Sequence, residues 1–241
     1  MVNDGQNTRA TDPAQISPGL MATGAPTVWI DGTRPLSAEA VAAIAAVCDS
    51  AEDHGGAGSV VVHVSGAPAA SRGRDVTVGL VSKWERGLRR LERLPAPTIG
   101  VATGDCGGTA LDTLLATDYR IAASSVRLLV PAEAGATWPG MALYRLCQCA
   151  DAAAIRRAVL FGVPIDVDDA LSLGLIDELT EDPLAAVAAA AEFSAAFSGS
   201  ELAIRRQLML DARTESFEDA LGRHLAACDR ELRRLSAGVT R

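Results

Sequence analysis

The stretch LERLPAPTIGVATGDCGGTALDTLLATDYRIAA, residues 91–123, decides the fold of this chain. Its first prolines end a helical pattern, because proline cannot continue a helix. An apolar strand is predicted over 98–102, followed by the glycine-rich turn TGDCGG and a helix over about 109–116. A second strand over 119–122 ends the stretch. Strand, turn, helix and strand in this order are typical of an α/β fold.

Strands and helices also alternate before and after this stretch, and the C-terminal part of the chain is helical. Strands are predicted over 27–30, 58–65, 127–130 and 175–179, and helices over 37–52, 78–94, 141–149, 151–161 and between Asp166 and Gly174. From Asp182 the pattern is helical in three pieces, and the last piece carries an apolar stripe of Phe217, Leu221, Leu225, Cys228, Leu232 and Leu235. We therefore expect a disordered tail over 1–25, an α/β core over 26–181 and a helical region over 182–241.

Composition excludes several classes of protein. The 241 residues carry a formal net charge of −8, which argues against nucleic-acid and anionic membrane surfaces as partners. A hydrophobic content of 49% excludes disorder for most of the chain. No apolar run approaches the ~20 residues of a membrane span, and the start lacks a secretory pattern. Five cysteines, an odd count, fit a reducing compartment, so we expect a cytoplasmic protein without a metal site.

The turn and helix over 98–116 form the best local candidate for a site. A helix that starts after a glycine-rich turn presents free N–H groups, which suit a phosphate or a developing oxyanion. The spacing matches neither the phosphate-loop nor the dinucleotide pattern. Asp112 lies three residues after Thr109, on the same helix face, where an acid or base would stand beside an oxyanion donor. The alternative is an acid that only favours the helix dipole.

Cys106 lies in the same turn and is a second candidate. A thiolate there would be a nucleophile if a base or a positive group stabilised it. No histidine is near in sequence: His54 falls in a loop, His63 in a buried strand and His224 on the last helix. Structural or surface roles are therefore favoured for the histidines.

Four segments resemble the crotonase (enoyl-CoA hydratase/isomerase) superfamily. Residues 91–123 are similar to its L-P-K-P-x-I-A-x-V-x-G … G-G-G … A-x-D-x-R-I-A segment, and 161–179 to T-G-x-x-I-x-A-x-x-A-x-x-x-G-L-V. Residues 131–140 resemble its P-E … G-x-x-P-G loop, and 65–76 occupy the place of its F-S-A-G-A-D-L loop. The resemblance covers about 27–235. It implies a spiral of ββα units with a C-terminal helical trimerisation region, homotrimers or hexamers, and acyl-CoA as substrate without a further cofactor.

The resemblance also implies site residues. The backbone donors of its oxyanion hole fall on Arg74 and Thr109, positions that are normally small, so their bulk narrows or reshapes the site. Its CoA-contacting loops fall on Arg72, Gly73, Gly107 and Gly108. One of the two hydratase carboxylates falls on Asp112, shortened from Glu. The other falls on Ala132, which cannot act as acid or base, and Glu133 is adjacent.

A narrower resemblance concerns residues 83–98, 104–112 and 130–141. They are similar to the hydratase-like protein of the dihydroxyphenylacetyl-CoA pathway, which supplies dihydroxyphenylglycine to glycopeptide antibiotics. There a type III polyketide synthase and crotonase-like proteins act together, and both are implied partners. Three hypotheses stay open: a dehydratase that uses Asp112 and Glu133, a non-catalytic auxiliary subunit of the synthase, and a degenerate fatty-acid enoyl-CoA hydratase.

Local charge adds one expectation. Residues 72–93 are rich in arginine and carry a net charge of +4, although the whole chain is acidic. Most of this run is expected to be a solvated helix face, helped by a Glu85–Arg89 pair one helical turn apart. In the resembled fold the run lies near the entrance for CoA, whose phosphates would pair with some of its arginines.

Overall fold

The computed structural model describes residues 24–69, 76–133, 135–138 and 140–239. Residues 1–23 of the expected tail lie outside the described residues. So do Arg72, Gly73 and Arg74, for which the sequence predicts CoA-binding and oxyanion roles.

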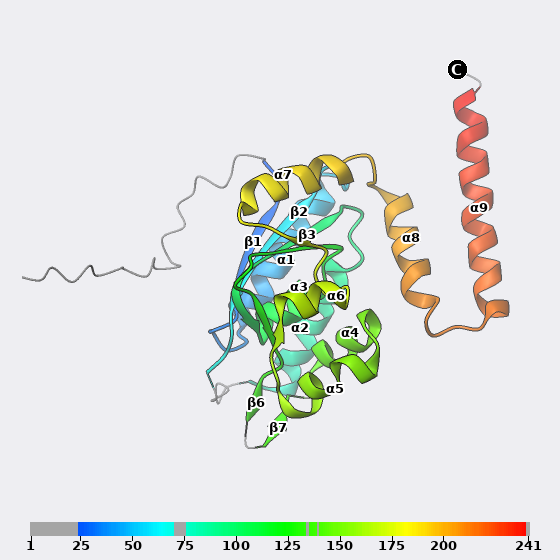
Figure 1. The fold of residues 1–241 in the computed structure, drawn as a ribbon. Helices are drawn as coiled ribbons and strands as arrows, with labels where there is room; N and C mark the ends of the chain where they lie inside the picture. The colour runs from blue at the N-terminus through cyan, green and yellow to red at the C-terminus, as the bar shows by residue number, and fades with distance from the viewer. Residues whose placement is uncertain (1–23, 70–75, 134, 139, 240–241) are drawn as a thin grey trace, which may run out of the picture.

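A mixed sheet forms the centre of the fold (Figure 1). Its main path is parallel and runs in the order β1 (Thr27–Asp31), β2 (Val60–Gly66), β3 (Thr98–Gly107), β4 (Tyr119–Ala122), β9 (Glu178–Leu179). β5 (Arg127–Leu129) pairs in parallel with the second half of β3, and β8 (Ile165–Asp166) pairs antiparallel with β5. This architecture confirms the predicted α/β class.

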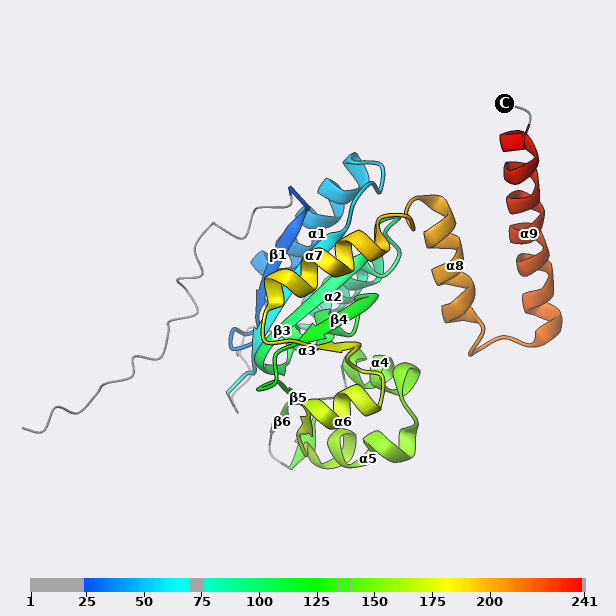
Figure 2. The ribbon, with the colours of Figure 1, turned by 45° about the horizontal axis from the view of Figure 1, so that its top comes forward.

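Side-chain alternation along the strands builds a core on each face of the sheet. Val60, Val62 and Val64 point into the larger core, whereas Val61 points into the smaller one. The larger core contains residues of α1 (Ala38–Asp53), α2 (Val78–Leu91) and α3 (Thr109–Leu114). The smaller core is covered by α7 (Pro183–Ser194), which Figure 2 shows lying across the strands. A parallel sheet needs such cover on both faces.

A smaller lobe follows the sheet in sequence. It consists of the hairpin β6 (Ala132–Glu133) and β7 (Ala136–Thr137), then α4 (Met141–Cys149), α5 (Ala152–Phe161) and α6 (Val167–Ser172). α5 ends at Gly162, whose φ is +65°, in the left-handed conformation that glycine adopts without strain.

The last two helices, α8 (Ser200–Asp211) and α9 (Phe217–Val239), stand to one side of the sheet in Figures 1 and 2. A partly buried ion pair holds α8: Arg206 Nε donates to Asp118 Oδ1 at 2.7 Å, and Arg206 Nη2 donates to the Ala96 carbonyl at 3.2 Å. Ion pairs such as Arg230–Glu201, at 2.9 Å, join α9 to α8. No helix in the described part of the chain is long and apolar enough to cross a membrane.

Most predicted elements are confirmed, and the differences have local causes. The predicted turn TGDCGG, residues 103–108, is mostly strand, because β3 continues through it to Gly107. Residues 105–107 find partners in Arg127–Leu129 of β5, which the local sequence could not reveal. α2 ends at Leu91 rather than residue 94, and the last strand shrinks to Glu178–Leu179. The predicted loop over 131–140 contains the β6–β7 hairpin.

Candidate functional site

A cavity of about 260 Å³ opens beside the N-terminus of α3. It brings together Gly108, Thr109 and Asp112, three of the residues singled out from the sequence. α2 adds Trp84 and Glu85 to the same wall. The rest of the lining is mostly apolar or proline: Leu36, Pro68, Val76, Val81, Pro131 and Trp138. A concave site with a few convergent polar groups is the usual form of a small-molecule site.

Close approach of three backbone segments shapes this end of the sheet. A Cβ on Gly32 would lie 2.2 Å from the Gly66 carbonyl oxygen and 2.5 Å from that of Gly107. A Cβ on Gly107 would lie 2.9 Å from the Cβ of Ala67. Gly108 has a φ of +57° and forms the N-cap of α3. These positions need glycine for lack of space or for the left-handed backbone. Gly107 and Gly108 therefore fix the direction in which α3 starts.

Thr109 is the first residue of α3 and is 8% exposed. The first N–H groups of a helix have no partner within it, so they are available to a ligand. Because Thr109 lines the cavity, its N–H is a candidate donor to an oxygen of a bound molecule. Its own carbonyl is occupied, since the Thr113 hydroxyl donates to it at 2.6 Å.

Asp112 lies one turn further and is 9% exposed. Its Oδ2 accepts from Trp84 Nε1 at 3.3 Å, and the Ala142 N–H also donates to its carboxyl group. Both donors favour the ionised carboxylate, but burial outweighs them. Burial first, and the negative charge of Glu85 second, raise the pKa of Asp112 to about 7. Asp112 is thus poised to give or take a proton near neutral pH.

Glu85 is a cavity residue that the sequence analysis does not predict. The sequence places it on a solvated face and pairs it with Arg89, and that pairing is wrong. Arg89 pairs with Glu92 at 2.8 Å, and Glu85 Oε2 accepts from Arg145 Nη1 at 2.9 Å. Burial raises the pKa of Glu85, against the opposing effect of Arg145. The one sequence signal that could have placed Glu85 at the cavity is its position next to Trp84, which belongs to the apolar stripe of α2.

Comparison with known proteins identifies the family. No family model matches the chain. An enoyl-CoA hydratase from Amycolatopsis orientalis is 57% identical over 205 residues, which are 85% of this chain and 94% of that protein. The chain belongs to the crotonase (enoyl-CoA hydratase/isomerase) superfamily.

Solved structures agree with a crotonase fold. An enoyl-CoA hydratase/isomerase from Marinobacter aquaeolei superimposes with a TM-score of 0.67 at 16% identity, covering 90% of this chain and 89% of that one. One from Cupriavidus metallidurans gives a TM-score of 0.69 at 17% identity, covering 86% and 85%. Together with the 57% identity to the Amycolatopsis orientalis protein, this makes the chain an enoyl-CoA-hydratase-like member of the superfamily.

Ala132, to which the motif resemblance assigns the second carboxylate position, pairs with Thr137 in the β6–β7 hairpin. Ala132 is exposed and its methyl group has no acid–base chemistry. Glu133 is next to it in β6, but its side chain lies outside the described part of the structure. The role predicted for Glu133 stays a prediction.

Cys106 is not placed as a nucleophile. Its side chain is fully buried, and burial raises the pKa of the thiol well above its ordinary value. A neutral, inaccessible thiol is unreactive. His63 is buried and stacks on Trp29 with ring centroids 3.8 Å apart, as expected of a structural histidine. Burial lowers its pKa to about 4, so the imidazole is neutral at physiological pH.

The arginine-rich run contains internal partners. Besides Arg89, Arg90 forms hydrogen bonds with Glu52 at 2.9 and 2.6 Å and a salt bridge with Asp49 at 2.7 Å. These two arginines already have carboxylates of the chain beside them, as expected of a solvated helix face. Binding of CoA phosphates by Arg72 stays a prediction.

The raised pKa of Asp112 predicts a pH-dependent stability. Below about pH 4 the carboxyl is protonated in both the folded and the unfolded chain. As pH rises towards 7, the unfolded chain ionises while the folded chain holds its proton, so stability is lost. With a folded pKa of about 7 and an unfolded pKa of about 3.9, the loss is about 4 kcal/mol by pH 8.

Urea unfolding of the wild type and of Asp112→Asn at pH 4 to 8 measures this loss. We expect the wild type to lose stability relative to the variant as pH rises, because the amide of the variant cannot ionise. A difference between the two proteins that stays constant over the whole range would contradict the raised pKa.

Proposed function

We propose that this protein binds a polyketide acyl-CoA and dehydrates it on the route to dihydroxyphenylacetyl-CoA. The observation that carries the proposal is Asp112, a buried carboxyl group with a pKa of about 7 in the same cavity as the first residue of α3. A proton donor beside oxyanion-stabilising N–H groups suits the loss of water next to a thioester carbonyl.

The chemistry follows from which group is charged at each stage. Removal of a proton from Cα places negative charge on the thioester oxygen. The Thr109 N–H, at the positive end of α3, would donate to that oxygen. Asp112 in its protonated form would deliver its proton to the hydroxyl that leaves from Cβ. Arg74 is proposed as the second backbone donor, and Glu133 as a further carboxylate.

The pathway assignment is supported by two observations. Residues 83–98, 104–112 and 130–141 resemble the hydratase-like protein of that pathway, and the Amycolatopsis orientalis enoyl-CoA hydratase matches across nearly its whole length. The alanine at position 132 disfavours ordinary water addition, which in the hydratase branch uses two carboxylates. We therefore propose a type III polyketide synthase and other crotonase-like proteins as partners, rather than fatty-acid oxidation.

Product analysis of the synthase, with and without this protein, tests the proposal. We expect the wild type to raise the yield of dihydroxyphenylacetyl-CoA, and Asp112→Asn to lower that gain by about 100-fold, the usual contribution of a general acid. Glu133→Gln, measured beside it, reports whether Glu133 contributes. Full product formation by both variants would contradict a catalytic role.

Product analysis, together with copurification and a crotonyl-CoA assay, distinguishes the three hypotheses. A non-catalytic subunit would copurify with the synthase and raise its rate even when it carries Asp112→Asn. A degenerate fatty-acid hydratase would instead turn over crotonyl-CoA efficiently and leave the products of the synthase unchanged. Each hypothesis therefore predicts a different combination of yield, copurification and crotonyl-CoA turnover.

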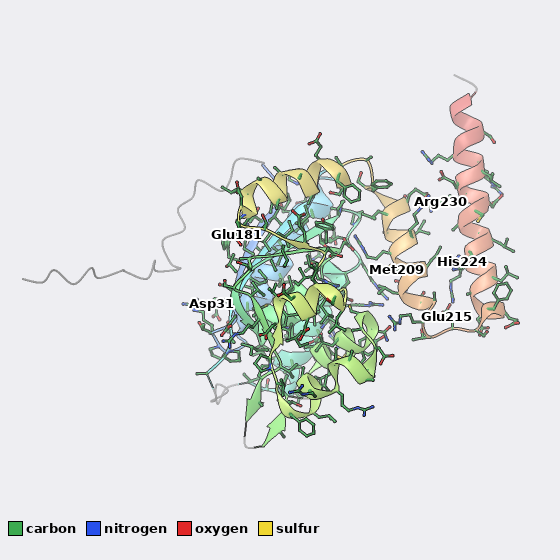
Figure 3. All side chains as sticks on the ribbon, viewed as in Figure 1. Asp31, Glu181, Met209, Glu215, His224 and Arg230 are labelled. Carbon is green, nitrogen blue, oxygen red and sulfur yellow. The ribbon has the colours of Figure 1, made fainter. Side chains whose placement is uncertain are left out.

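We also propose that α9 mediates self-association into a homotrimer or hexamer. Its apolar side chains do not pack on the sheet: Phe217 is 73% exposed, Leu225 58% and Leu232 64%. Figure 3, which labels Met209 on α8 and Arg230 on α9, shows α9 beside α8, on the side of α8 that faces away from the sheet. Exposed apolar stripes of this kind mark association surfaces.

Light scattering of Leu225→Asp tests this proposal. We expect the wild type to have the mass of an oligomer and the variant to dissociate, because an aspartate would be buried at the contact. Leu184→Asp on α7 is the matched control, since Leu184 is 55% exposed. A monomeric wild type, or equal masses for the wild type and Leu225→Asp, would contradict the role of α9.

A further inference from the structure

Glu85 and Asp112 reach the same cavity from two different helices. α2 carries Glu85 immediately after Trp84, whose indole N–H donates to Asp112 Oδ2 at 3.3 Å. This hydrogen bond ties α2 to α3 at the cavity wall. Both carboxyl groups line the cavity together with Thr109. The Glu85 side chain keeps 18% of its surface exposed, so it is accessible to a molecule in the cavity.

The two carboxyl groups have different partners. Arg145 Nη1 donates to Glu85 at 2.9 Å, and the Arg145 side chain is only 7% exposed. In the described residues Asp112 accepts from neutral donors, Trp84 Nε1 and the Ala142 N–H. Burial raises the pKa of both carboxyl groups. The Arg145 guanidinium opposes this rise for both, but it is in direct hydrogen-bonding contact with Glu85. Like charges in one site also oppose ionisation of both groups together.

In the part of the chain that the structure describes, two arginines and a further carboxylate complete the charges near the pair. Arg145 Nε donates to Glu92 Oε1 at 2.6 Å, and Arg89 donates to the other oxygen of Glu92 at 2.8 Å. Glu92 is therefore bound by two arginines and does not line the cavity. Arg34 lines the cavity, but its side chain is 82% exposed and lies 4.0 Å from Asp31. Glu85 is thus the carboxylate of the Arg145 cluster that faces the cavity.

We propose that Glu85 is the catalytic base of this protein and forms a working pair with Asp112, the acid. This inference rests on the proposed dehydration and assigns the role that Ala132 cannot fill. Glu85 would take the Cα proton, and the C–H electron pair would form an enolate on the thioester oxygen beside Thr109. As the carbonyl re-forms, the Cα–Cβ double bond forms and the Cβ–O bond breaks.

Proton balance closes within the pair. The departing hydroxyl takes the Asp112 proton and leaves as water, so Asp112 ends ionised and Glu85 ends protonated. Transfer of that proton from Glu85 to Asp112, directly or through water, restores the starting state. The step uses no oxidant or reductant. Arg145 acts as a positioning residue, since it holds Glu85 by a hydrogen bond and favours the ionised carboxylate that a base needs.

The alternative is that Glu85 only anchors Arg145. Exchange of the α-protons of phenylacetyl-CoA in D₂O, followed by NMR, separates the two roles because exchange needs a base and an oxyanion donor but no leaving group. We expect Glu85→Gln to lower the exchange rate constant by about 100-fold or more. Its affinity for phenylacetyl-CoA should stay within about threefold of the wild-type value.

Two variants complete the design. Glu92→Gln is the matched control, because it also removes a carboxylate from Arg145 but leaves the cavity intact, and we expect exchange within about threefold of wild type. Asp112→Asn should lower pathway dehydration by about 100-fold, as above, yet retain most of the exchange. Circular dichroism and unfolding curves verify that each variant is folded.

If the wild type is active and Glu85→Gln and Glu92→Gln exchange α-protons at equal rates, Glu85 is not the base. That result would leave the proposed function standing. Absence of exchange in the wild type would overturn the base, whereas loss of the pathway yield in every assay would overturn the proposed function itself.

Discussion

The absence of space for a Cβ at Gly32 and Gly107 is the constraint on which the site depends. The ends of β1, β2 and β3 come so close that a methyl group on Gly32 would overlap the Gly66 and Gly107 carbonyl oxygens. The chain then turns at Gly108, with a positive φ, straight into α3. A bulkier residue at either tight position would push these segments apart. The start of α3 would then be displaced, and the carboxyl group of Asp112 would be displaced with it.

A competition between burial and hydrogen bonding sets the chemistry of the cavity. Two N–H donors, from Trp84 and Ala142, favour a charged Asp112, yet desolvation and the neighbouring Glu85 favour the neutral acid. For Glu85, burial also raises the pKa, but Arg145 opposes that rise by direct contact at 2.9 Å. The two carboxyl groups of one cavity therefore differ in their contacts, a guanidinium for Glu85 and neutral N–H donors for Asp112, and such a difference in environment is what separates the roles of an acid–base pair. The loss of a carboxylate at position 132 is compatible with catalysis in this setting.

Local patterns predict most of the fold. Strand 119–122 and the helices starting at residues 78 and 141 follow from apolar periodicity, and the cap at Ser37 from its side chain. Asp112 and Thr109 are predicted as neighbours because three-residue spacing on a helix is a local property. The length of β3 is not predictable in this way, since its last residues pair with β5, about twenty residues away in sequence. Glu85 is missed for the same reason: its partner Arg145 lies in another helix, and periodicity does not show tertiary contacts.

The ionisation of Asp112 is the central claim, and its most direct measurement is a pH titration of the Asp112 side-chain carboxyl carbon by ¹³C NMR, assigned with the Asp112→Asn variant. The account predicts a midpoint near pH 7, in line with a buried acid beside Glu85. A midpoint near 4, the ordinary value for aspartate, would mean that Asp112 is ionised at neutral pH and would contradict its role as the acid.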